Sequence, residues 1–277
     1  MNNHLLSNIE KSSGTFSKGQ RRIAAFIEKH YEKAAFMTAS KLGQEVGVSE
    51  STVVRFATEI GYDGYPSLQK AMQEMVRSKL TSVQRIEVAC DRIGDNDVLS
   101  AVLNLDIEKI RHTLEETSKD DFNHAVDALI SSKKIYIVAS RSASALAAFL
   151  GYYFNLIFDE VAVINAASES ELFEKMLRID QRDSVIGISF PRYSRNVAKA
   201  LQFAASRKAC VISVTDSESS PLAAPSRYLL LARSDMVSIV DSLVAPLSLI
   251  NALIVAVALK RKDEISERFD QLEKIWD

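Results

Sequence analysis

Short runs rich in valine and isoleucine alternate with helical segments from residue 134 onward, and this alternation constrains the fold more than any other feature. These valine- and isoleucine-rich runs are, in order, KIYIVAS, VAVIN, DSVIGISF and ACVISVTD, and RYLLLA is expected to be a fifth strand. Strands that are separated by a helix run parallel, because the helix returns the chain to the same edge of the sheet. The sequence therefore predicts an α/β class, with a five-stranded parallel sheet flanked by helices on both faces.

Residues 1–79 show a different pattern, that of short helices without strands. Ser17 followed by Gln20 is a capping box, and apolar residues at helical spacing come after it. Thr38 is placed to cap a second helix, Gly47 to end it, and Ser49 to cap a third. This part of the chain is predicted to be all-α.

The length of 277 residues suits about two domains. We expect an all-α domain over residues 1–79, a helical connector over 80–120 and the α/β domain over 121–277. The longest apolar run, residues 243–259, is shorter than the ~20 residues that span a bilayer. It predicts a helix in the core or in a dimer surface, and not a membrane segment.

The all-α part contains a pattern typical of a helix-turn-helix, in which two helices cross over a tight turn. Gly47 supplies the left-handed turn, while Leu42, Val53 and Phe56 are expected to face inward. Outward at the start of the second helix lie Ser49, Glu50, Ser51, Thr52 and Arg55. Side chains at these positions meet base edges in the major groove of DNA. The alternative is an ordinary helical hairpin in a bundle.

Charge is distributed in a way that permits DNA contact at one end of the chain. Residues 1–80 hold 11 Lys and Arg against 8 Asp and Glu, a net charge of +3. Residues 81–277 hold 23 against 28, a net charge of −5. The basic residues placed to meet phosphates are Lys18, Arg21, Arg22 and Lys41. These charges favour DNA binding over the plain hairpin.

Two of the strand-to-helix turns carry serines and an arginine. The first turn has Ser140, Arg141, Ser142 and Ser144, and the second has Ser189, Arg192, Tyr193 and Ser194. Ligands of parallel sheets bind outside the carboxyl ends of the strands, where helix N-termini present free amides. Hydroxyls, amides and guanidinium groups together suit a phosphate. The alternative is that the serines only cap helices.

Three stretches of the chain carry a resemblance to a known family: FSKGQRRIAAFI, SKLGQEVGVSESTVVRFATEIGYDGYPSLQ and ISFPRYSRNVAKALQFAASRKACVISVTDSESSPLA. Through them the whole chain resembles the RpiR/MurR family of bacterial transcription regulators. The resemblance implies an N-terminal helix-turn-helix domain and a C-terminal sugar isomerase (SIS) domain that binds a phosphorylated sugar as effector. It also implies operator DNA as a partner.

The resemblance extends to single positions of the two turns. Ser142 matches the serine of the first SIS turn, and Ser189 and Ser194 match the first serine and the last hydroxyl of the second. The chain departs from the family where glycine is frequent, at Ala139, Arg141 and Arg192, and where serine is usual, at Pro191. These departures close space near the ligand and add positive charge, so that another anionic metabolite is also compatible.

A sugar-phosphate isomerase that interconverts aldose and ketose is the alternative function, since SIS folds occur in such enzymes. An isomerase needs a general base close to the sugar, and Glu169, Glu171 and Glu174 follow the second predicted strand. We include Glu171 among the ligand-binding residues. No histidine lies in the sheet region from 134 onward, and His124 is the nearest. We therefore expect no catalysis. A third possibility is a sugar-phosphate sensor without a DNA role.

The remaining features bear on compartment and partners. The chain has two cysteines, Cys90 and Cys210, and four scattered histidines, so the sequence predicts neither a metal site nor a cofactor. No signal peptide is apparent, and a cytoplasmic location is expected. We expect a homodimer or homotetramer, because a short reading helix contacts few bases and a two-fold partner doubles the site.

Overall fold

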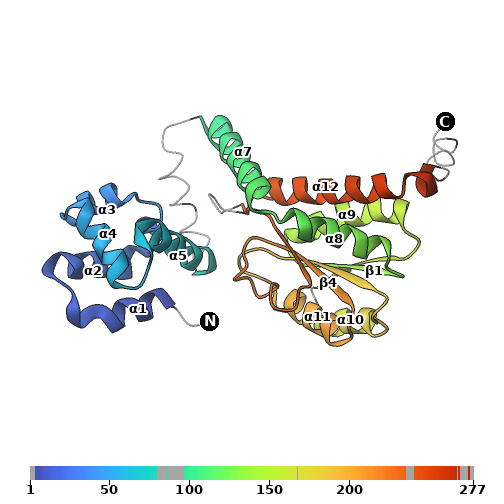
Figure 1. Cartoon of the computed structure of the whole chain (residues 1–277), viewed down its shortest axis with the longest axis horizontal. Helices are drawn as coiled ribbons and strands as arrows, with labels where there is room; N and C mark the ends of the chain where they lie inside the picture. Colours follow the sequence, from blue (N-terminus) through green and yellow to red (C-terminus); the bar gives the residue numbers. More distant parts are fainter. Residues whose placement is uncertain are drawn as a thin grey trace. The chain divides into compact units, whose positions relative to one another are not determined.

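The computed structural model describes residues 4–79, 86, 97–166, 168–234, 240–266, 268 and 274. Contacts divide the chain into two compact units, which are described separately. The first unit contains helices α1 to α5, and the second contains all five strands and helices α7 to α12 (Figure 1). Of the predicted connector, residues 80–85 and 87–96 lie outside the described residues.

In its described residues the first unit contains helices and no strand, as the sequence predicted. Its elements are α1 (His4–Ser12), the 3-10 turn η1 (Ser13–Thr15), α2 (Lys18–Ala34), α3 (Ala39–Val46), α4 (Glu50–Glu59) and α5 (Gly64–Lys79). The three predicted caps are confirmed. Ser17 accepts from Gln20 in a capping box, Thr38 caps α3 and Ser49 caps α4. These local bonds satisfy N–H groups that a helix start otherwise leaves unpaired.

One hydrophobic core joins the helices of the first unit. Leu42, Val53 and Phe56, which were predicted to face inward, are fully buried. Ile23 and Ile27 of α2 are buried against them, and the core continues into α5. The apolar faces therefore fix how α3 and α4 cross, which positions the start of α4 at the surface.

The second unit contains a parallel sheet whose strands match the five predicted runs. The strands are β1 (Ile135–Ala139), β2 (Val161–Asn165), β3 (Ser184–Ile188), β4 (Cys210–Thr215) and β5 (Tyr228–Leu231). Their order across the sheet is β2-β1-β3-β4-β5, and every neighbouring pair is parallel. Strand β1 therefore lies between β2 and β3, at the point where the strand order reverses direction.

Helices cover both faces of this sheet (Figure 1). Residues of α8 (Lys119–Ile130), α9 (Ala143–Ile157) and α12 (Val244–Lys260) share a core with Ile135 and Ile137 of β1. Residues of α10 (Glu169–Met176) and α11 (Arg195–Ser206) share a second core with Tyr136 and Val138. Since alternate residues of a strand point to opposite faces, the two cores lie on the two sides of the sheet. Helices α9 and α11, which follow β1 and β3, thus lie on opposite sides.

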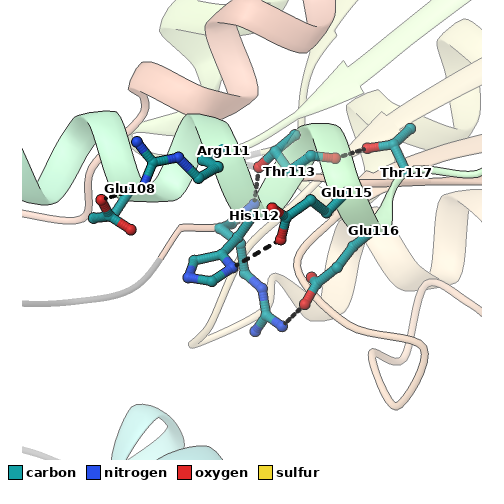
Figure 2. Close-up of polar contacts among 8 residues, drawn as sticks. Glu108, Arg111, His112, Thr113, Glu115, Glu116 and Thr117 are labelled. Carbon is teal, nitrogen blue, oxygen red and sulfur yellow. Dashed lines mark hydrogen bonds and ion pairs between the residues drawn. The ribbon is translucent and has the colours of Figure 1, made fainter.

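Helix α7 (Val98–Glu116) falls in the predicted connector and packs against α12 in the second unit. Its C-terminal end is held to the end of β5 by polar contacts (Figure 2). The hydroxyl of Thr113 accepts the main-chain N–H of Arg233 at 2.9 Å, and the Thr117 hydroxyl lies 2.7 Å from the carbonyl oxygen of Leu231. Glu116 forms an ion pair with the Arg233 guanidinium.

The apolar run at residues 243–259 forms most of α12. Leu249, Ile250 and Leu253 are buried in the core, whereas Val255 and Leu259 on the same helix are exposed. The run thus belongs to the core on one side and leaves an apolar face on the other. In the part of the chain that the structure describes, no helix is both long enough and apolar enough to cross a bilayer.

Candidate functional site

The turn between α3 and α4 has the geometry of a helix-turn-helix. Gly47 ends α3 with φ of 71°, in the left-handed region predicted for it. Val48 donates its N–H to the carbonyl oxygen of Gly43 at 2.8 Å, which folds the turn back on α3. Arg22 of α2 donates from Nη2 to the carbonyl oxygen of Gly47 at 3.0 Å. Arg22, which we expected at a phosphate, therefore also fixes the turn.

The start of α4 gathers the small polar residues that the sequence singled out. Ser49 Oγ accepts the Thr52 N–H at 3.3 Å and lies 2.9 Å from Ser51 Oγ and 2.8 Å from Thr52 Oγ1. Arg55 donates from Nε to the Ser51 carbonyl oxygen at 3.3 Å, which aligns its side chain along the helix surface. Ser49, Glu50, Ser51 and Arg55 are exposed, and Thr52 is half-buried. This surface has the donors and acceptors that base edges can meet.

The predicted phosphate contacts lie near the same helix. Lys18 and Arg21 are exposed in the first turns of α2, a helix that contacts both α3 and α4. Arg21 Nε donates to the Phe16 carbonyl oxygen at 3.1 Å. Lys41 is exposed at the start of α3, where its N–H donates to the Thr38 hydroxyl. The exposed basic residues thus lie on α2 and α3, the two helices that contact α4 in this part of the unit.

A second site lies in the α/β unit, where β1 and β3 end side by side. Because α9 and α11 leave these strands toward opposite faces, a crevice forms between the two turns; such a switch point is where open α/β sheets bind ligands. The crevice holds a cavity of about 50 Å³. Its lining residues are Ser140, Arg141, Ser142, Ala143, Ser189, Phe190, Pro191, Arg192, Ser194, Asp241 and Leu243.

Both arginines of the two turns have a left-handed backbone, with φ of 58° at Arg141 and 67° at Arg192. This region favours glycine, so the fold holds each arginine in a conformation that is unfavourable for its type. Arg141 donates from Nη1 to the carbonyl oxygen of Arg192 at 3.1 Å, and Arg192 Nη2 lies 3.2 Å from Asp241 Oδ2. The arrangement concentrates two guanidinium groups and one carboxylate at the crevice.

The serines of the turns take different roles. Ser189 is buried, and its Oγ accepts the Ser194 N–H at 3.0 Å. Ser194 caps α11, since its Oγ accepts the Val197 N–H at 3.5 Å. Ser142 stands at the cap position of α9 without a side-chain cap bond, and its side chain is exposed. The capping alternative therefore describes Ser194, while Ser142 presents a hydroxyl to the cavity.

Three of the predicted ligand residues do not line this cavity. Ser144 Oγ is buried within the first turn of α9. The Tyr193 hydroxyl donates to Asp216 Oδ1 at 2.8 Å, after β4. Glu171 is exposed in the first turn of α10. Conversely, Asp241 lines the cavity although the sequence analysis did not predict it. No local pattern in the sequence links Asp241 to Arg192, which lies 49 residues earlier.

A wider hollow of about 540 Å³ lies at the opposite edge of the sheet and is open to solvent. Its lining residues are Asp180, Gln181, Arg182, Ser206, Arg207 and Lys208. Bonds from Arg182 hold the pKa of Asp180 at about 2, well below its usual value. This hollow lies before β3 and after α11, away from the carboxyl ends of the strands, so the smaller crevice is the better ligand site.

Two family models match the chain. Residues 3–79 match the helix-turn-helix domain of the rpiR family, and residues 128–256 match the SIS domain. The HTH-type transcriptional regulator HexR of Escherichia coli (strain K12) is 25% identical over 232 residues, 79% of this chain and 74% of HexR. HexR of Pseudomonas aeruginosa is 24% identical over 267 residues, 93% of this chain and 90% of that protein.

Solved structures show the same architecture. The sugar isomerase domain of an RpiR transcription factor from Sphaerobacter thermophilus is 26% identical with a TM-score of 0.61, covering 64% of this chain and 98% of that one. The Vibrio vulnificus NanR protein, complexed with ManNAc-6P, is 19% identical with a TM-score of 0.60, covering 98% of this chain and 97% of that one. With both domain models matched in this order, the chain belongs to the RpiR family of helix-turn-helix transcriptional regulators, and its C-terminal part is a SIS domain.

Proposed function

We propose that this regulator binds operator DNA through α4 and that a phosphorylated sugar or related anionic metabolite, bound at the β1 and β3 crevice, controls its operator affinity. One observation carries the proposal. Arg141 and Arg192 meet at the switch point of a SIS sheet, in a chain that also contains a helix-turn-helix. In this reading residues 1–79 bind DNA, residues 80–120 connect, and residues 121–277 bind the effector.

The DNA contacts follow from the exposed start of α4. Ser51, Arg55 and Glu50 face solvent where a recognition helix enters the major groove. Arg55 would give two parallel hydrogen bonds to a guanine, the commonest specific contact of this kind. Lys18, Arg21 and Lys41 would meet phosphates, which position the helix without reading sequence.

The effector class follows from the crevice. Two guanidinium groups, the exposed Ser142 hydroxyl and the N-termini of α9 and α11 together favour an anion with several oxygen atoms. The complex of NanR with ManNAc-6P supports a sugar phosphate.

We also propose that the SIS domain binds without catalysis, in a cytoplasmic protein. Glu171 is exposed and lines no part of the crevice among the described residues, and Glu169 is paired with Lys199 at 2.7 Å. His124 stacks on Tyr228 of the edge strand β5. No general base therefore faces the cavity from these positions. The competing function is an aldose–ketose isomerase.

A homodimer suits this function, and helix α7 presents a surface for it. The exposed apolar side chains on α7 include Leu103, Ile107, Ile110 and Leu114. Their alternating spacing of four and three residues is the seam of a paired helix. A second copy of this chain would cover the seam and place two α4 helices on two half-sites. Leu114→Glu should then lower the molecular mass measured by sedimentation.

The first test is DNA binding by the full-length protein. The protein should bind labelled duplexes from the DNA that adjoins its own gene at low ionic strength. The logarithm of the binding constant should fall linearly with the logarithm of the salt concentration. Competition by unlabelled random duplex separates specific from non-specific binding. A protein that ignores every duplex at low ionic strength contradicts the proposal.

The second test is a thermal-shift screen of the full-length protein. ManNAc-6P, other hexose 6-phosphates and inorganic phosphate should raise the melting temperature, because a ligand of the native state stabilises it. The matched sugars without phosphate should not. The binders are then assayed for aldose–ketose conversion, with Glu171→Gln as the control. Turnover that Glu171→Gln abolishes would establish the isomerase instead.

A further inference from the structure

A continuous set of polar contacts leads from the effector crevice to α7. It begins with the bond from Arg141 Nη1 to the Arg192 carbonyl and the ion pair of Arg192 with Asp241. The next residue, Ser242, donates from Oγ to Asp106 Oδ1 of α7 at 2.7 Å. Asp106 in turn accepts from Lys109 Nζ at 3.0 Å. Two neighbouring residues, Asp241 and Ser242, therefore join the crevice to the helix.

Asp241 places a carboxylate against a guanidinium group at the cavity. Its carboxylate is 13% exposed and lies 3.2 Å from Arg192 Nη2, while the residue lines the cavity. The cavity volume of about 50 Å³ is well below the ~300 Å³ of a typical ligand pocket. A sugar phosphate can enter only if lining side chains move, and the Arg192–Asp241 pair closes the crevice beside the arginine.

Helix α7 is held at its middle and at its C-terminal end, by different partners. Lys109 is buried next to Asp106, at the contact with Ser242. Further along, Thr113, Thr117 and Glu116, which Figure 2 labels, contact Leu231 at the end of β5 and Arg233 just after it. The β5 contacts do not involve the crevice. Through Ser242, a main-chain shift at Asp241 would reach α7 at Asp106, apart from the contacts at the C-terminal end of the helix.

We infer that Asp241 is a built-in counter-anion, which the effector's anion displaces from Arg192, and that this displacement changes how α7 is held through Ser242 and Asp106. Two anions at one guanidinium repel each other strongly in a partly buried site, so the carboxylate and the ligand compete. Because Ser242 follows Asp241 directly, a main-chain shift that carries the carboxylate away from Arg192 also moves the Ser242 contact. The inference rests on the proposed function.

Binding of inorganic phosphate tests the first half of the inference. In the full-length protein, Asp241→Asn keeps the side-chain size but removes the competing charge. Calorimetry at fixed ionic strength should give a phosphate affinity at least about fivefold higher than that of the wild type, the lower end of typical site couplings. Asp180→Asn is the matched control, because it removes an arginine-paired carboxylate at the opposite edge of the sheet. It should leave phosphate affinity unchanged.

Operator binding tests the second half. Without phosphate, Asp241→Asn should bind the operator with the affinity that wild type shows at saturating phosphate. Ser242→Ala should bind phosphate as wild type does, but phosphate should change its operator affinity far less. Ser248→Ala, which removes another hydroxyl bond near the start of α12, is its control and should respond normally.

The outcomes separate this inference from the proposed function. If wild type responds to phosphate but Asp241→Asn has wild-type phosphate affinity, the counter-anion is refuted. If Ser242→Ala keeps the full response, the connection to α7 is refuted. If wild type itself binds neither duplex nor phosphate, the proposed function fails, and the inference fails with it.

Discussion

Gly43 and Val48 approach each other so closely that the helix-turn-helix admits no side chain at residue 43. The Val48 N–H donates to the Gly43 carbonyl oxygen at 2.8 Å, and a Cβ on Gly43 would come within 2.8 Å of the Val48 carbonyl oxygen. Main-chain atoms cannot move aside as a flexible side chain can. The crossing of α3 and α4, and hence the presentation of α4, depends on this contact.

Gly43→Ala should therefore destabilise the first unit by about 1–3 kcal/mol, the range for overpacking a tight site. Operator affinity should fall as well, because α4 would be tilted. Chemical denaturation and a gel-shift titration measure the two effects. Gly14→Ala is the control, since a Cβ there meets no atom within 4 Å. Equal effects of the two substitutions would contradict the geometry of the turn.

Arg55→Ala should weaken specific operator binding by about 1–3 kcal/mol and relax discrimination at one base pair. The reason is the loss of a base contact from the exposed surface of α4. Binding to a panel of operators with single substitutions measures both quantities. Arg178→Ala removes an exposed arginine from the other unit and should change neither. If Arg55→Ala keeps the wild-type sequence preference, α4 is not the reading helix.

Ser189→Ala combined with Ser194→Ala should abolish the effector response but leave DNA binding intact. Ser194 also caps α11, so the double variant should lose about 0.5–2 kcal/mol of stability. Ser118→Ala removes the corresponding cap of α8 and controls for that loss. Operator titrations with and without the effector distinguish the two effects. A double variant that responds like Ser118→Ala would place the ligand elsewhere.

Lys208→Gly should stabilise the protein by up to about 1 kcal/mol. Lys208 has φ of 64° just after α11. The Lys208 N–H donates to the Ala205 carbonyl oxygen, and the Ala209 N–H donates to the Ala204 carbonyl oxygen. This is the Schellman pattern, in which glycine is preferred, and a left-handed conformation costs other residues about 1–2 kcal/mol. Lys208→Ala keeps the conformation and should give no gain in urea denaturation. A glycine variant no more stable than the alanine variant would refute the prediction.

Ionisation of Tyr65 should lower the free energy of unfolding as the pH rises above 10. Burial raises its pKa from 10.0 to about 12 in the folded chain, so its contribution is complete below pH 10 and is lost as the pH rises toward 12. Its hydroxyl donates to the Met37 carbonyl oxygen at 2.7 Å. Tyr65→Phe should lose about 1 kcal/mol at pH 8 and show a smaller further loss between pH 10 and 12. Thermal unfolding measures both, with the exposed Tyr152→Phe as control.

The sequence predicted the elements because their signals are local. Apolar runs marked all five strands, four of them rich in valine and isoleucine. Ser17, Thr38 and Ser49 marked helix starts through bonds to N–H groups three residues away. The helix-turn-helix was predictable for the same reason, since Gly47 carries its own conformational preference.

What the sequence did not reveal depends on contacts between distant segments. Asp241 reaches Arg192 only because the sheet order places the segment before α12 beside the β3 turn. The left-handed backbone of Arg141 and Arg192 could not be inferred, because arginine does not favour it. Likewise Glu171 follows a strand end as predicted, but α10 begins at the edge strand β2 and leaves Glu171 exposed.

The strand order also has a consequence for how the molecule is made. Helices α1 to α5 form their core from residues close in sequence. In contrast, β1 can pair with β3 only after β3 has been synthesised, and the crevice is complete only after Asp241 has been synthesised. Local contacts form quickly, and during synthesis the N-terminal domain generally folds first. Each newly translated chain therefore passes through a stage at which a finished DNA-reading unit has left the ribosome before any metabolite can be sensed.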